Sequence, residues 1–406
     1  MTYDITIVGG GLVGATLAAL LGTRDMSVAL VEARRASTTL PDPETDPRVS
    51  AITVASRRIL DATGAWPRLA LEHTGIFREM RVWDAQGSGS IHFDCARVGV
   101  AELGHIIANA ELQRALDQVL HGLDTVDWYR PASLESVDVS GEKLMLGLDA
   151  GEIKTRLLVG ADGCDSRVRA LCELGGEPVS YGQSAVAANV LMEEHHRYTA
   201  WQCFLPTGPL AFLPLAGNRC AVVWSTEPET AQRLVAQESV AFAAALGEAF
   251  DFRLGRVLEV GGRGAFPLRS MHAERYVGAR TALVGDAAHS IHPLAGQGLN
   301  LGLLDAAVLA EVVLETVSQG RDPGGQRSLR RYARWRRGHN ALAWRAMGAF
   351  KTLFGDSRPG VRLARNLGLD AMDRLPLAKD VIMGLASGLW GDLPAAARGR
   401  GSISGG

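Results

Sequence analysis

The residues whose types and spacing point most directly to chemistry lie between positions 285 and 300, where the chain reads GDAAHSIHPLAGQGLN. The acidic Asp286 follows a short apolar strand expected over residues 281–284, and a loop containing Pro293 leads into a helix expected over residues 298–318. A carboxylate at a strand tip can bind the hydroxyls of a polyol, and the start of a helix favours negative charge. A reduced flavin can make both contacts, because its ribityl chain carries hydroxyls and its ring carries negative charge near N1.

A glycine-rich turn near the N-terminus indicates a dinucleotide site. Residues 9–14 read GGGLVG, which fits G-x-G-x-x-G, between a strand expected over residues 3–8 and a helix expected over residues 11–22. Glu32 ends the next strand, 18 residues after Gly14. The glycines let the backbone approach a pyrophosphate at the helix start, and the carboxylate accepts hydrogen bonds from ribose hydroxyls. A second anion beside Glu32 would be repelled, so the pattern favours the adenine ribose of FAD or NAD over NADP.

Two further segments have both a structural and a functional interpretation. Residues 160–169, GADGCDSRVR, follow another apolar strand and read structurally as a turn with a helix N-cap at Asp165 or Ser166. Residues 46–51, DPRVSA, place Arg48 after a Pro-containing loop, where its charge can simply be solvated.

These motifs, in this order and spacing, closely resemble those of class A flavoprotein monooxygenases. Three longer segments are similar to those of the ubiquinone-biosynthesis (polyprenyl-phenol) hydroxylases: residues 204–215, residues 292–302 and residues 386–394. The resemblance implies that residues 160–169 lie near the FAD pyrophosphate and the path of NAD(P)H, and that Arg48 and Asn109 reach the cofactor. The chain departs from the family at residues 303–305, Leu-Leu-Asp, where many members have a basic residue before the Asp.

The cofactor-binding residues expected from the motifs and the resemblance come from six segments of the chain. They are Gly9, Gly11, Leu12, Val13, Gly14, Glu32, Ala33, Arg48, Asn109, Asp162, Gly285, Asp286, Pro293, Gly296, Gln297, Gly298, Leu299 and Asn300. No catalytic base can be assigned. No metal site is expected, because His289 and His292 have no carboxylate or thiol partner at a usual ligand spacing.

The resemblance implies an FAD-dependent monooxygenase that uses NADPH or NADH and O2 to hydroxylate the ring of a polyprenylated phenol through a C4a-hydroperoxyflavin. Three alternatives stay open: a related hydroxylase of another aromatic or polyketide substrate, an oxygen-independent reductase of the same fold, and a non-catalytic subunit that retains FAD. Consumption of O2 separates the reductase from the hydroxylases. The position of ring hydroxylation, the length of the prenyl tail and the oligomeric state are not encoded in readable motifs.

Composition sets broad limits. A chain of 406 residues that is 47% hydrophobic and 21% charged is an ordinary globular protein with two or three domains, and a net charge of −2 gives no reason to expect a nucleic-acid partner. Five scattered cysteines with no CxxC pair favour a reducing cytoplasm. The N-terminus runs directly into a strand, so no signal peptide is expected. The apolar run at 381–390 is shorter than the ~20 residues of a membrane-spanning helix.

The element pattern predicts an α/β fold with a Rossmann-like FAD-binding domain, an inserted and mostly antiparallel β-sheet substrate domain, and a helical C-terminal segment. We expect the FAD-binding domain in three parts and the substrate sheet in two, followed by the C-terminal segment. The FAD-binding parts are residues 1–70, 95–180 and 276–326, the substrate sheet comprises 71–94 and 181–275, and the C-terminal segment is 327–406. Helices are expected over residues 51–63, 109–120 and 231–247, and Gly217-Asn218 favours a hairpin.

The C-terminal end is basic. Residues 321–406 contain 14 Arg and 2 Lys against 6 Asp and no Glu, a net charge of +10, which leaves −12 for the first 320 residues. Within residues 328–354, basic side chains alternate with large apolar ones such as Trp335, Leu342 and Phe350. This pattern predicts either a peripheral membrane or lipid-carrier contact for delivery of a lipid-tailed phenol, or a helix that packs on the acidic body of the protein.

Overall fold

The computed structural model describes residues 2–35, 46–70, 74–291, 297–356 and 358–398. The first sheet carries the Rossmann-like topology, with the strand order β17-β18-β11-β1-β2-β8, and β9 and β10 extend it beside β11. Its strands are β1 (Thr2–Val8), β2 (Val28–Val31), β8 (Val126–Tyr129), β9 (Leu134–Asp138), β10 (Leu144–Leu148), β11 (Gly151–Gly160), β17 (Val277–Gly278) and β18 (Thr281–Leu283). Neighbours from β18 through β11, β1 and β2 to β8 are all parallel. All four residues of β2 are buried, as expected where both faces of a parallel sheet are covered.

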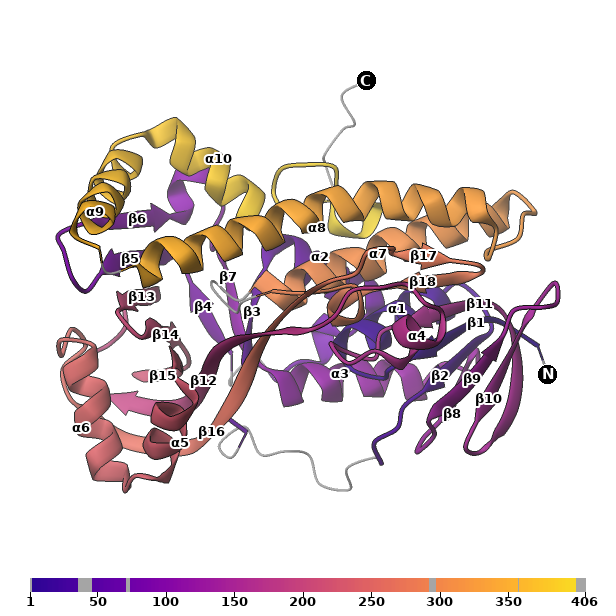
Figure 1. The fold of residues 1–406 in the computed structure, drawn as a ribbon, viewed down its shortest axis with the longest axis horizontal. Helices are drawn as coiled ribbons and strands as arrows, with labels where there is room; N and C mark the ends of the chain where they lie inside the picture. Colours follow the sequence, from indigo (N-terminus) through magenta and orange to yellow (C-terminus); the bar gives the residue numbers. More distant parts are fainter. Residues whose placement is uncertain (1, 36–45, 71–73, 292–296, 357, 399–406) are drawn as a thin grey trace.

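Helices from distant parts of the chain pack together beside this sheet. Helix α1 (Leu12–Gly22) contacts both α3 (Asn109–His121) and α7 (Gln297–Ser318), and α7 contacts α2 (Val54–Thr63). A further short helix, α4 (Arg167–Leu171), follows β11. Nine of the eleven residues of α1 are buried, so this helix forms part of the core rather than an amphipathic surface layer. These helices bring the starts of α1 and α7 to the same end of the sheet (Figure 1).

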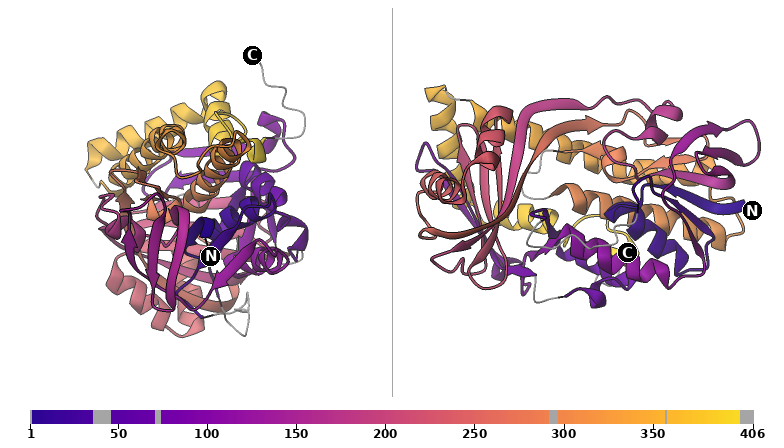
Figure 2. Two further views of the ribbon diagram at one scale, coloured as in Figure 1. Left: turned by 90° about the vertical axis from the view of Figure 1, so that its right-hand side faces the viewer. Right: turned by 90° about the horizontal axis from the view of Figure 1, so that it is seen from below.

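The second sheet is antiparallel except for one parallel pair, and has the order β19-β16-β12-β15-β14-β13-β5-β6. Its strands are β5 (Glu79–Asp84), β6 (Ser90–Asp94), β12 (Val179–Met192), β13 (Thr199–Leu205), β14 (Gly208–Pro214), β15 (Arg219–Thr226), β16 (Val257–His272) and β19 (His289–Ser290). The long pair β12 and β16 runs between the two halves of the molecule (Figures 1 and 2). A third, small sheet lies beside β14 and consists of β3 (Val49–Thr53), β4 (Gly75–Phe77) and β7 (Gly104–Ala108).

The C-terminal residues form three helices and a short 3-10 turn. Helix α8 (Gln326–Gly355) extends along one side of the molecule, and α9 (Pro359–Asp373) and α10 (Pro376–Ala386) continue at the end that carries β5 and β6 (Figure 1). A buried ion pair holds this segment, because Arg365 Nε donates to Asp84 Oδ2 at 2.8 Å and both side chains are almost fully buried. The α/β fold class with a parallel sheet, a separate antiparallel sheet and C-terminal helices is therefore confirmed.

Two predicted helices were wrong in detail. The helix expected over residues 51–63 begins only at Val54, because residues 49–53 pair with β7, and the Thr53 side chain caps the helix. The helix expected over residues 231–247 is two helices, α5 (Pro228–Ala236) and α6 (Ser239–Ala249), separated at Gln237, whose backbone is extended. The hairpin at Gly217 and Asn218 joins β14 to β15 as predicted. The domain boundaries drawn from the sequence stay a prediction.

Candidate functional site

Three predicted loops meet at the carboxyl edge of the parallel sheet, where β1, β11 and β18 end side by side. Backbone contacts within and between these loops leave no room for a side chain at Gly9 or Gly14. A Cβ at Gly9 would lie 2.3 Å from the carbonyl oxygen of Ala161, and one at Gly14 would lie 1.9 Å from the carbonyl oxygen of Gly9. Gly285 packs against Val13, to which a Cβ would approach within 3.2 Å. The carboxyl edge of a parallel sheet is where ligands bind in this class of fold.

Glu32 stands at the end of β2, beside the glycine turn, and is 7% exposed. Its Oε2 accepts a hydrogen bond from the Gly10 N–H at 2.9 Å, and its Oε1 accepts one from the Arg34 N–H at 2.9 Å. Burial alone would raise the pKa of Glu32, but these hydrogen bonds outweigh burial and lower it. The side chain is therefore an anchored carboxylate with acceptor capacity left, as a ribose diol requires. The adjacent Ala33 is exposed.

The start of α1 fits a pyrophosphate. No side chain caps this helix, and its first turn contains no acidic residue, so its terminal N–H groups are left for an anion. A Cβ at Gly11 would meet no atom within 4 Å, which shows that this side of the turn is open. Leu12 and Val13 follow as half-buried residues. The close packing at Gly9 and Gly14 and the open space at Gly11 together fit the phosphates of FAD.

The start of α7 is held against the small third sheet by Asn300. Its Nδ2 donates to the Ala51 carbonyl oxygen at 2.7 Å, and its Oδ1 accepts from the Thr53 N–H at 3.0 Å. Asn300 is almost fully buried, and Gln297, Gly298 and Leu299 before it are half-buried. Pro293 and Gly296 lie outside the described residues. Helix α7 also contacts the short turn at residues 285–287, which follows β18.

Three predicted cofactor residues have protein partners in the structure. Arg48 forms a bidentate pair with Asp46, with Nη2 2.7 Å from Oδ2 and its side chain 49% exposed. Asn109 begins α3 and accepts a hydrogen bond from the Ser50 hydroxyl at 2.6 Å. Asp162 accepts from the backbone N–H groups of residues 167 and 168 and from the Ser166 hydroxyl, so it helps to cap α4. The capping interpretation of residues 160–169 therefore applies to Asp162 as well as to Ser166.

Asp286 has the placement that its position after β18 predicted. Its side chain is exposed, yet it is surrounded by protein atoms, and the resulting desolvation raises the pKa of its carboxyl group, with His289 opposing the effect. Solvent exposure combined with desolvation is typical of a carboxylate in a recess and suits a partner that donates hydrogen bonds, such as a polyol.

A buried network around Asp305 was missed in the sequence. Asp305 is fully buried and accepts from the Gly285 N–H at 3.1 Å, from Arg336 Nε at 2.7 Å and from Asn340 Nδ2 at 2.9 Å, and His289 Nε2 lies 2.5 Å from its Oδ2. Burial by itself would raise the pKa of Asp305, but the charges of His289 and Arg336 outweigh burial and hold it well below its usual range. The network ties α7 and α8 to the backbone of the residue before Asp286. An Asp within the apolar run of residues 301–310 was the sequence signal for this network.

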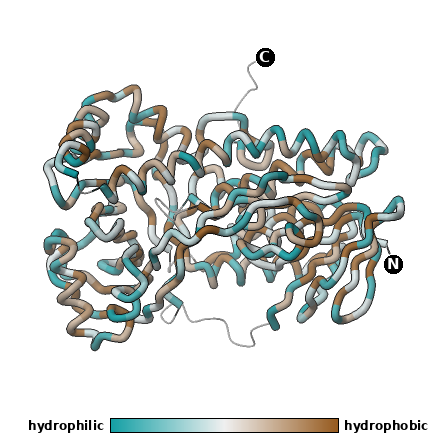
Figure 3. The backbone as a smooth tube through the Cα atoms, viewed as in Figure 1, coloured by the Kyte–Doolittle hydropathy of each residue, from teal (hydrophilic) through white to brown (hydrophobic). Residues whose placement is uncertain are grey.

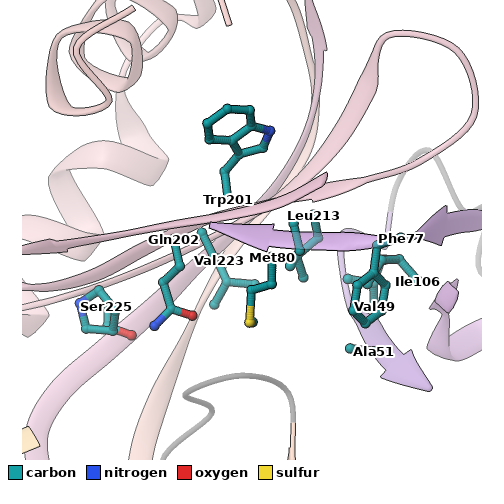
Figure 4. A pocket seen from close by; sticks show the side chains of 13 residues that line it. Val49, Ala51, Phe77, Met80, Ile106, Trp201, Gln202, Leu213, Val223 and Ser225 are labelled. Atoms are coloured by element: carbon teal, nitrogen blue, oxygen red, sulfur yellow. The ribbon is translucent and has the colours of Figure 1, made fainter. Parts of the chain in front are cut away.

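An apolar cavity of about 110 Å³ lies between the third sheet and the antiparallel sheet (Figure 4). Its lining residues come from seven strands, β3, β4, β5, β7, β13, β14 and β15. The thirteen lining residues are Val49, Ala51, Phe77, Met80, Ile106, Ala200, Trp201, Gln202, Pro209, Ala211, Leu213, Val223 and Ser225. Ala51 is also the residue whose carbonyl oxygen Asn300 binds, so the cavity adjoins the start of α7. No metal-binding cluster of His, Cys, Asp or Glu occurs among the described residues.

Comparison with known proteins agrees with this geometry. The family described as "FAD binding domain" matches residues 2–347, most of the chain. The chain belongs to the FAD-binding flavoprotein monooxygenases. It is 38% identical over 393 residues to "Ubiquinone hydroxylase UbiL" of Rhodospirillum rubrum, covering 95% of this chain and 89% of that protein. It is 35% identical over 387 residues to "3-demethoxyubiquinol 3-hydroxylase" of Escherichia coli, covering 95% and 98%.

This flavoprotein also shares its fold with solved structures. The crystal structure of p-nitrophenol 4-monooxygenase PnpA from Pseudomonas putida DLL-E4 superposes with a TM-score of 0.75 at 20% identity, over 94% of this chain and 97% of that one. At that identity the likeness concerns the fold alone. The predictions of an FAD-dependent hydroxylase of the class A family, and of FAD as its cofactor, are confirmed by the family and the relatives.

Proposed function

We propose that this hydroxylase uses NADPH or NADH and O2 to hydroxylate the aromatic ring of a polyprenylated phenol in ubiquinone biosynthesis. The observation that carries the proposal is the apolar cavity beside the start of α7, because an aromatic ring needs an apolar site next to the reacting cofactor. The names of the relatives, a ubiquinone hydroxylase and a demethoxyubiquinol hydroxylase, support the choice of substrate.

The residues predicted from the motifs are proposed to hold FAD in three places. The start of α1 with Gly11 would bind the pyrophosphate, Glu32 would accept hydrogen bonds from the adenine ribose, and Asp286 would accept them from the ribityl chain. The chemistry that FAD supplies when bound is acceptance of a hydride from NAD(P)H and activation of O2. The start of α7 would stabilise negative charge on the ring, and the apolar walls would exclude water from the reacting phenol.

A direct test is product analysis with purified holoenzyme. Incubation with a short prenylated phenol, NADPH or NADH and O2 should yield a product heavier by one oxygen atom, and with ¹⁸O2 that atom should carry the label. O2 consumption stimulated by the phenol, without incorporation, would show that NAD(P)H is oxidised without hydroxylation and that the phenol is an effector and not the substrate. Reduction of a double bond in the absence of O2 would instead favour the reductase alternative.

We infer that a second, smaller cavity would accommodate part of the prenyl tail. It is about 50 Å³ in volume, is lined by Phe204, Leu205 and Phe354 among others, and shares Pro209 with the first cavity. It lies at the C-terminal end of α8, because Lys351, Phe354 and Gly355 also line it. A prenyl tail that leaves the larger cavity past Pro209 would therefore emerge among the C-terminal helices.

The surface of these helices is apolar. Eleven of the nineteen exposed large hydrophobic residues of the described chain lie between positions 342 and 390, including Leu363, Leu367 and Leu377. Figure 3 shows hydrophobic residues along α9 and α10 at the upper left of the molecule. Five exposed arginines on α8 have no ion pair among the described residues: Arg327, Arg330, Arg334, Arg337 and Arg345. None of the described helices is long and apolar enough to span a bilayer.

We propose that this surface meets an anionic bilayer, from which the lipid-tailed phenol is taken. The arginines expected to pair with the protein body are only partly used in that way: Arg336 and Arg365 are buried in ion pairs, whereas those named above stay exposed. The apolar face expected over residues 328–354 also packs inward in part, since Phe354 is buried. We therefore expect the exposed apolar residues of α9 and α10, in place of the apolar face of residues 328–354, to enter the membrane interface.

Vesicle flotation tests the membrane contact. Holoenzyme should float with vesicles that contain anionic lipid at low salt and be released as salt screens the attraction. Leu377→Glu should reduce co-flotation. Val240→Glu on α6 is the matched control, because Val240 is 83% exposed and Leu377 is 81% exposed. Equal flotation of both variants, or binding that is indifferent to salt, would contradict the contact and leave delivery by a lipid carrier.

A further inference from the structure

The imidazole ring of His289 lies between two carboxylates of the flavin-side loop. His289 is completely buried on β19, three residues after Asp286. Its Nε2 lies 2.5 Å from Asp305 Oδ2, the same oxygen that accepts a hydrogen bond from the Gly285 N–H. Its Nδ1 is buried and has no hydrogen-bond partner among the described residues. A nitrogen–oxygen contact this short with a buried carboxylate is typical of a charge-assisted hydrogen bond, in which the ring is an imidazolium.

Asp286 needs a positive neighbour in order to stay ionised. Desolvation by the surrounding protein atoms raises the pKa of its carboxyl group and so favours the protonated form, and the charge of His289 opposes this effect. An ionised carboxylate only accepts hydrogen bonds, whereas a protonated one uses part of that capacity to donate. The charge of His289 therefore bears on how well Asp286 accepts hydrogen bonds from the hydroxyls of a polyol.

Two titratable side chains face His289 from the antiparallel sheet and the segment that follows it. His272 on β16 pairs with His289 on β19, and the ring of Tyr276 stacks on that of His289 with the centroids 6.2 Å apart. Desolvation lowers the pKa of His272, and the charge of His289 adds to this effect. Desolvation raises the pKa of Tyr276 far above its usual range. Both side chains are therefore uncharged near neutral pH.

The remaining charged groups around His289 come from α8 and α4. Arg336 on α8 donates to Asp305 Oδ1, and its Nη1 lies 3.2 Å from His339 Nδ1. Desolvation and the charge of Arg336 lower the pKa of His339, so this ring is neutral near pH 7. Arg169 on α4 donates to two backbone carbonyl oxygens and forms no ion pair among the described residues. His289 is thus the histidine of this region whose charge a buried carboxylate stabilises.

We propose that His289 is a positioning residue for the cofactor: Asp305 holds it as an imidazolium, and its charge keeps Asp286 in the carboxylate form that accepts hydrogen bonds from the ribityl chain. The inference rests on the proposed function, in which Asp286 binds that chain, and deepens it. Because Asp305 also binds the Gly285 N–H, one buried carboxylate supports both the shape of the turn and the charge of its exposed side chain.

A double-mutant cycle on FAD binding tests the inference. Each variant is purified as holoenzyme, and the FAD released on dilution at pH 7 is measured by flavin fluorescence. His289→Gln retains a side-chain N–H donor but carries no charge, and it should weaken FAD binding roughly tenfold in the wild-type background. In the Asp286→Asn background, the same substitution should change FAD affinity less than about twofold, because no carboxylate charge is left to support.

The pH profile of FAD affinity separates the charge of His289 from a purely structural role. Binding should weaken as the pH falls through the pKa of Asp286. Without the imidazolium this pKa is raised further, so the loss in His289→Gln should begin at a higher pH than in the wild type. Asp305→Asn keeps the shape of the side chain but no longer holds the imidazolium, and it should shift the profile in the same direction. His339→Gln, which removes the neighbouring imidazole on α8, is the matched control and should retain the wild-type profile.

Equal effects of His289→Gln on FAD affinity in both backgrounds would overturn the inference and show that His289 acts only through the fold. Unshifted pH profiles would overturn it as well, and the profile of Asp305→Asn decides the matter if His289→Gln does not fold. Wild-type FAD affinity in Asp286→Asn would overturn both the inference and the proposed position of the ribityl chain. Product analysis reports the function separately, because the expected cycle without hydroxylation would refute the function and leave the inference standing.

Discussion

The loops at the carboxyl edge of the parallel sheet and the larger apolar cavity differ in how many hydrogen bonds their side chains make. At the loops, Glu32 and Asn300 each bind backbone groups of neighbouring segments, and the carboxylate of Asp305 accepts hydrogen bonds from three elements. The cavity is lined mainly by apolar side chains, and Gln202 and Ser225 are the polar ones among the described residues that line it. The difference teaches that hydrogen bonds within the protein hold the loops in place, whereas the cavity is shaped mainly by the packing of apolar side chains. Substitutions in the two regions should therefore separate effects on folding from effects on binding.

The largest expected effect is at Gly14. A Cβ there would lie 1.9 Å from the Gly9 carbonyl oxygen, so Gly14→Ala must displace the backbone of the turn. We expect little or no folded, FAD-containing protein, measured as the flavin-to-protein ratio and the thermal midpoint of the purified variant. Gly11→Ala is the matched control, because its Cβ would meet nothing within 4 Å. If Gly14→Ala folds and retains FAD like Gly11→Ala, the tight-turn interpretation is wrong.

Asp305→Ala should come next. Removing this carboxylate leaves Arg336 buried without its ion-pair partner, a change that typically costs about 3–5 kcal/mol of folding stability. The thermal midpoint of the FAD-free protein should therefore fall clearly, and FAD content should fall with it. A midpoint close to that of the wild type would refute the structural role of the network.

The same carboxylate predicts a pH dependence. The pKa of Asp305 is lowered by folding, so its stabilising contribution is complete above the unfolded value of about 4 and is lost as the pH falls toward the folded value. The wild-type midpoint should fall as the pH is lowered through this range. Asp305→Asn should be less stable at pH 7 and should lose less stability on acidification. Parallel pH profiles for the two proteins would show that another group is responsible.

Asp286→Ala should affect binding and not folding. The residue is exposed, and desolvation by the surrounding protein atoms raises the pKa of its carboxyl group, with His289 opposing the effect. Loss of a charge-assisted hydrogen bond to the ribityl chain should cost about 1.5–3 kcal/mol, or roughly ten- to a hundredfold in FAD affinity. Fluorescence titration of the apoprotein with FAD measures this change. A large fall in the thermal midpoint of the apoprotein would instead show that Asp286, like Asp305, stabilises the fold.

Arg48→Ala should have the smallest effect on stability. Its pair with Asp46 is about half exposed on the arginine side, and exposed ion pairs contribute roughly 0–1 kcal/mol. The thermal midpoint should therefore stay nearly unchanged. Any fall in FAD affinity would then report a direct contact of Arg48 with the cofactor, because the fold would be intact. Unchanged FAD affinity would assign Arg48 to the surface pair with Asp46 alone.

The sequence was sufficient to predict the FAD cofactor and the family, but not the cavity between the third sheet and the antiparallel sheet. The turn at residues 9–14, Glu32 and Asp286 were recognisable because each depends on neighbours within a few residues: a strand that ends, a glycine that permits a close turn, a helix that begins. Gln202 and Ser225 have no such local signature. Each is an ordinary alternating residue of a strand, and becomes a cavity residue only because β13 and β15 face the third sheet.

By itself, the sequence determined the βαβ turn, the FAD-binding family and the hydroxylase class, because backbone geometry at glycines and helix starts is encoded locally. Only the tertiary structure decided that Asp305 is buried with His289 and Arg336, so that α8 helps to hold the loop at Gly285. It also decided that a cavity without charged side chains among the described residues lies beside α7. The physical reason is the same in each case. Burial, desolvation and the pairing of charges depend on which distant segments meet, and strand order and helix packing fix those meetings.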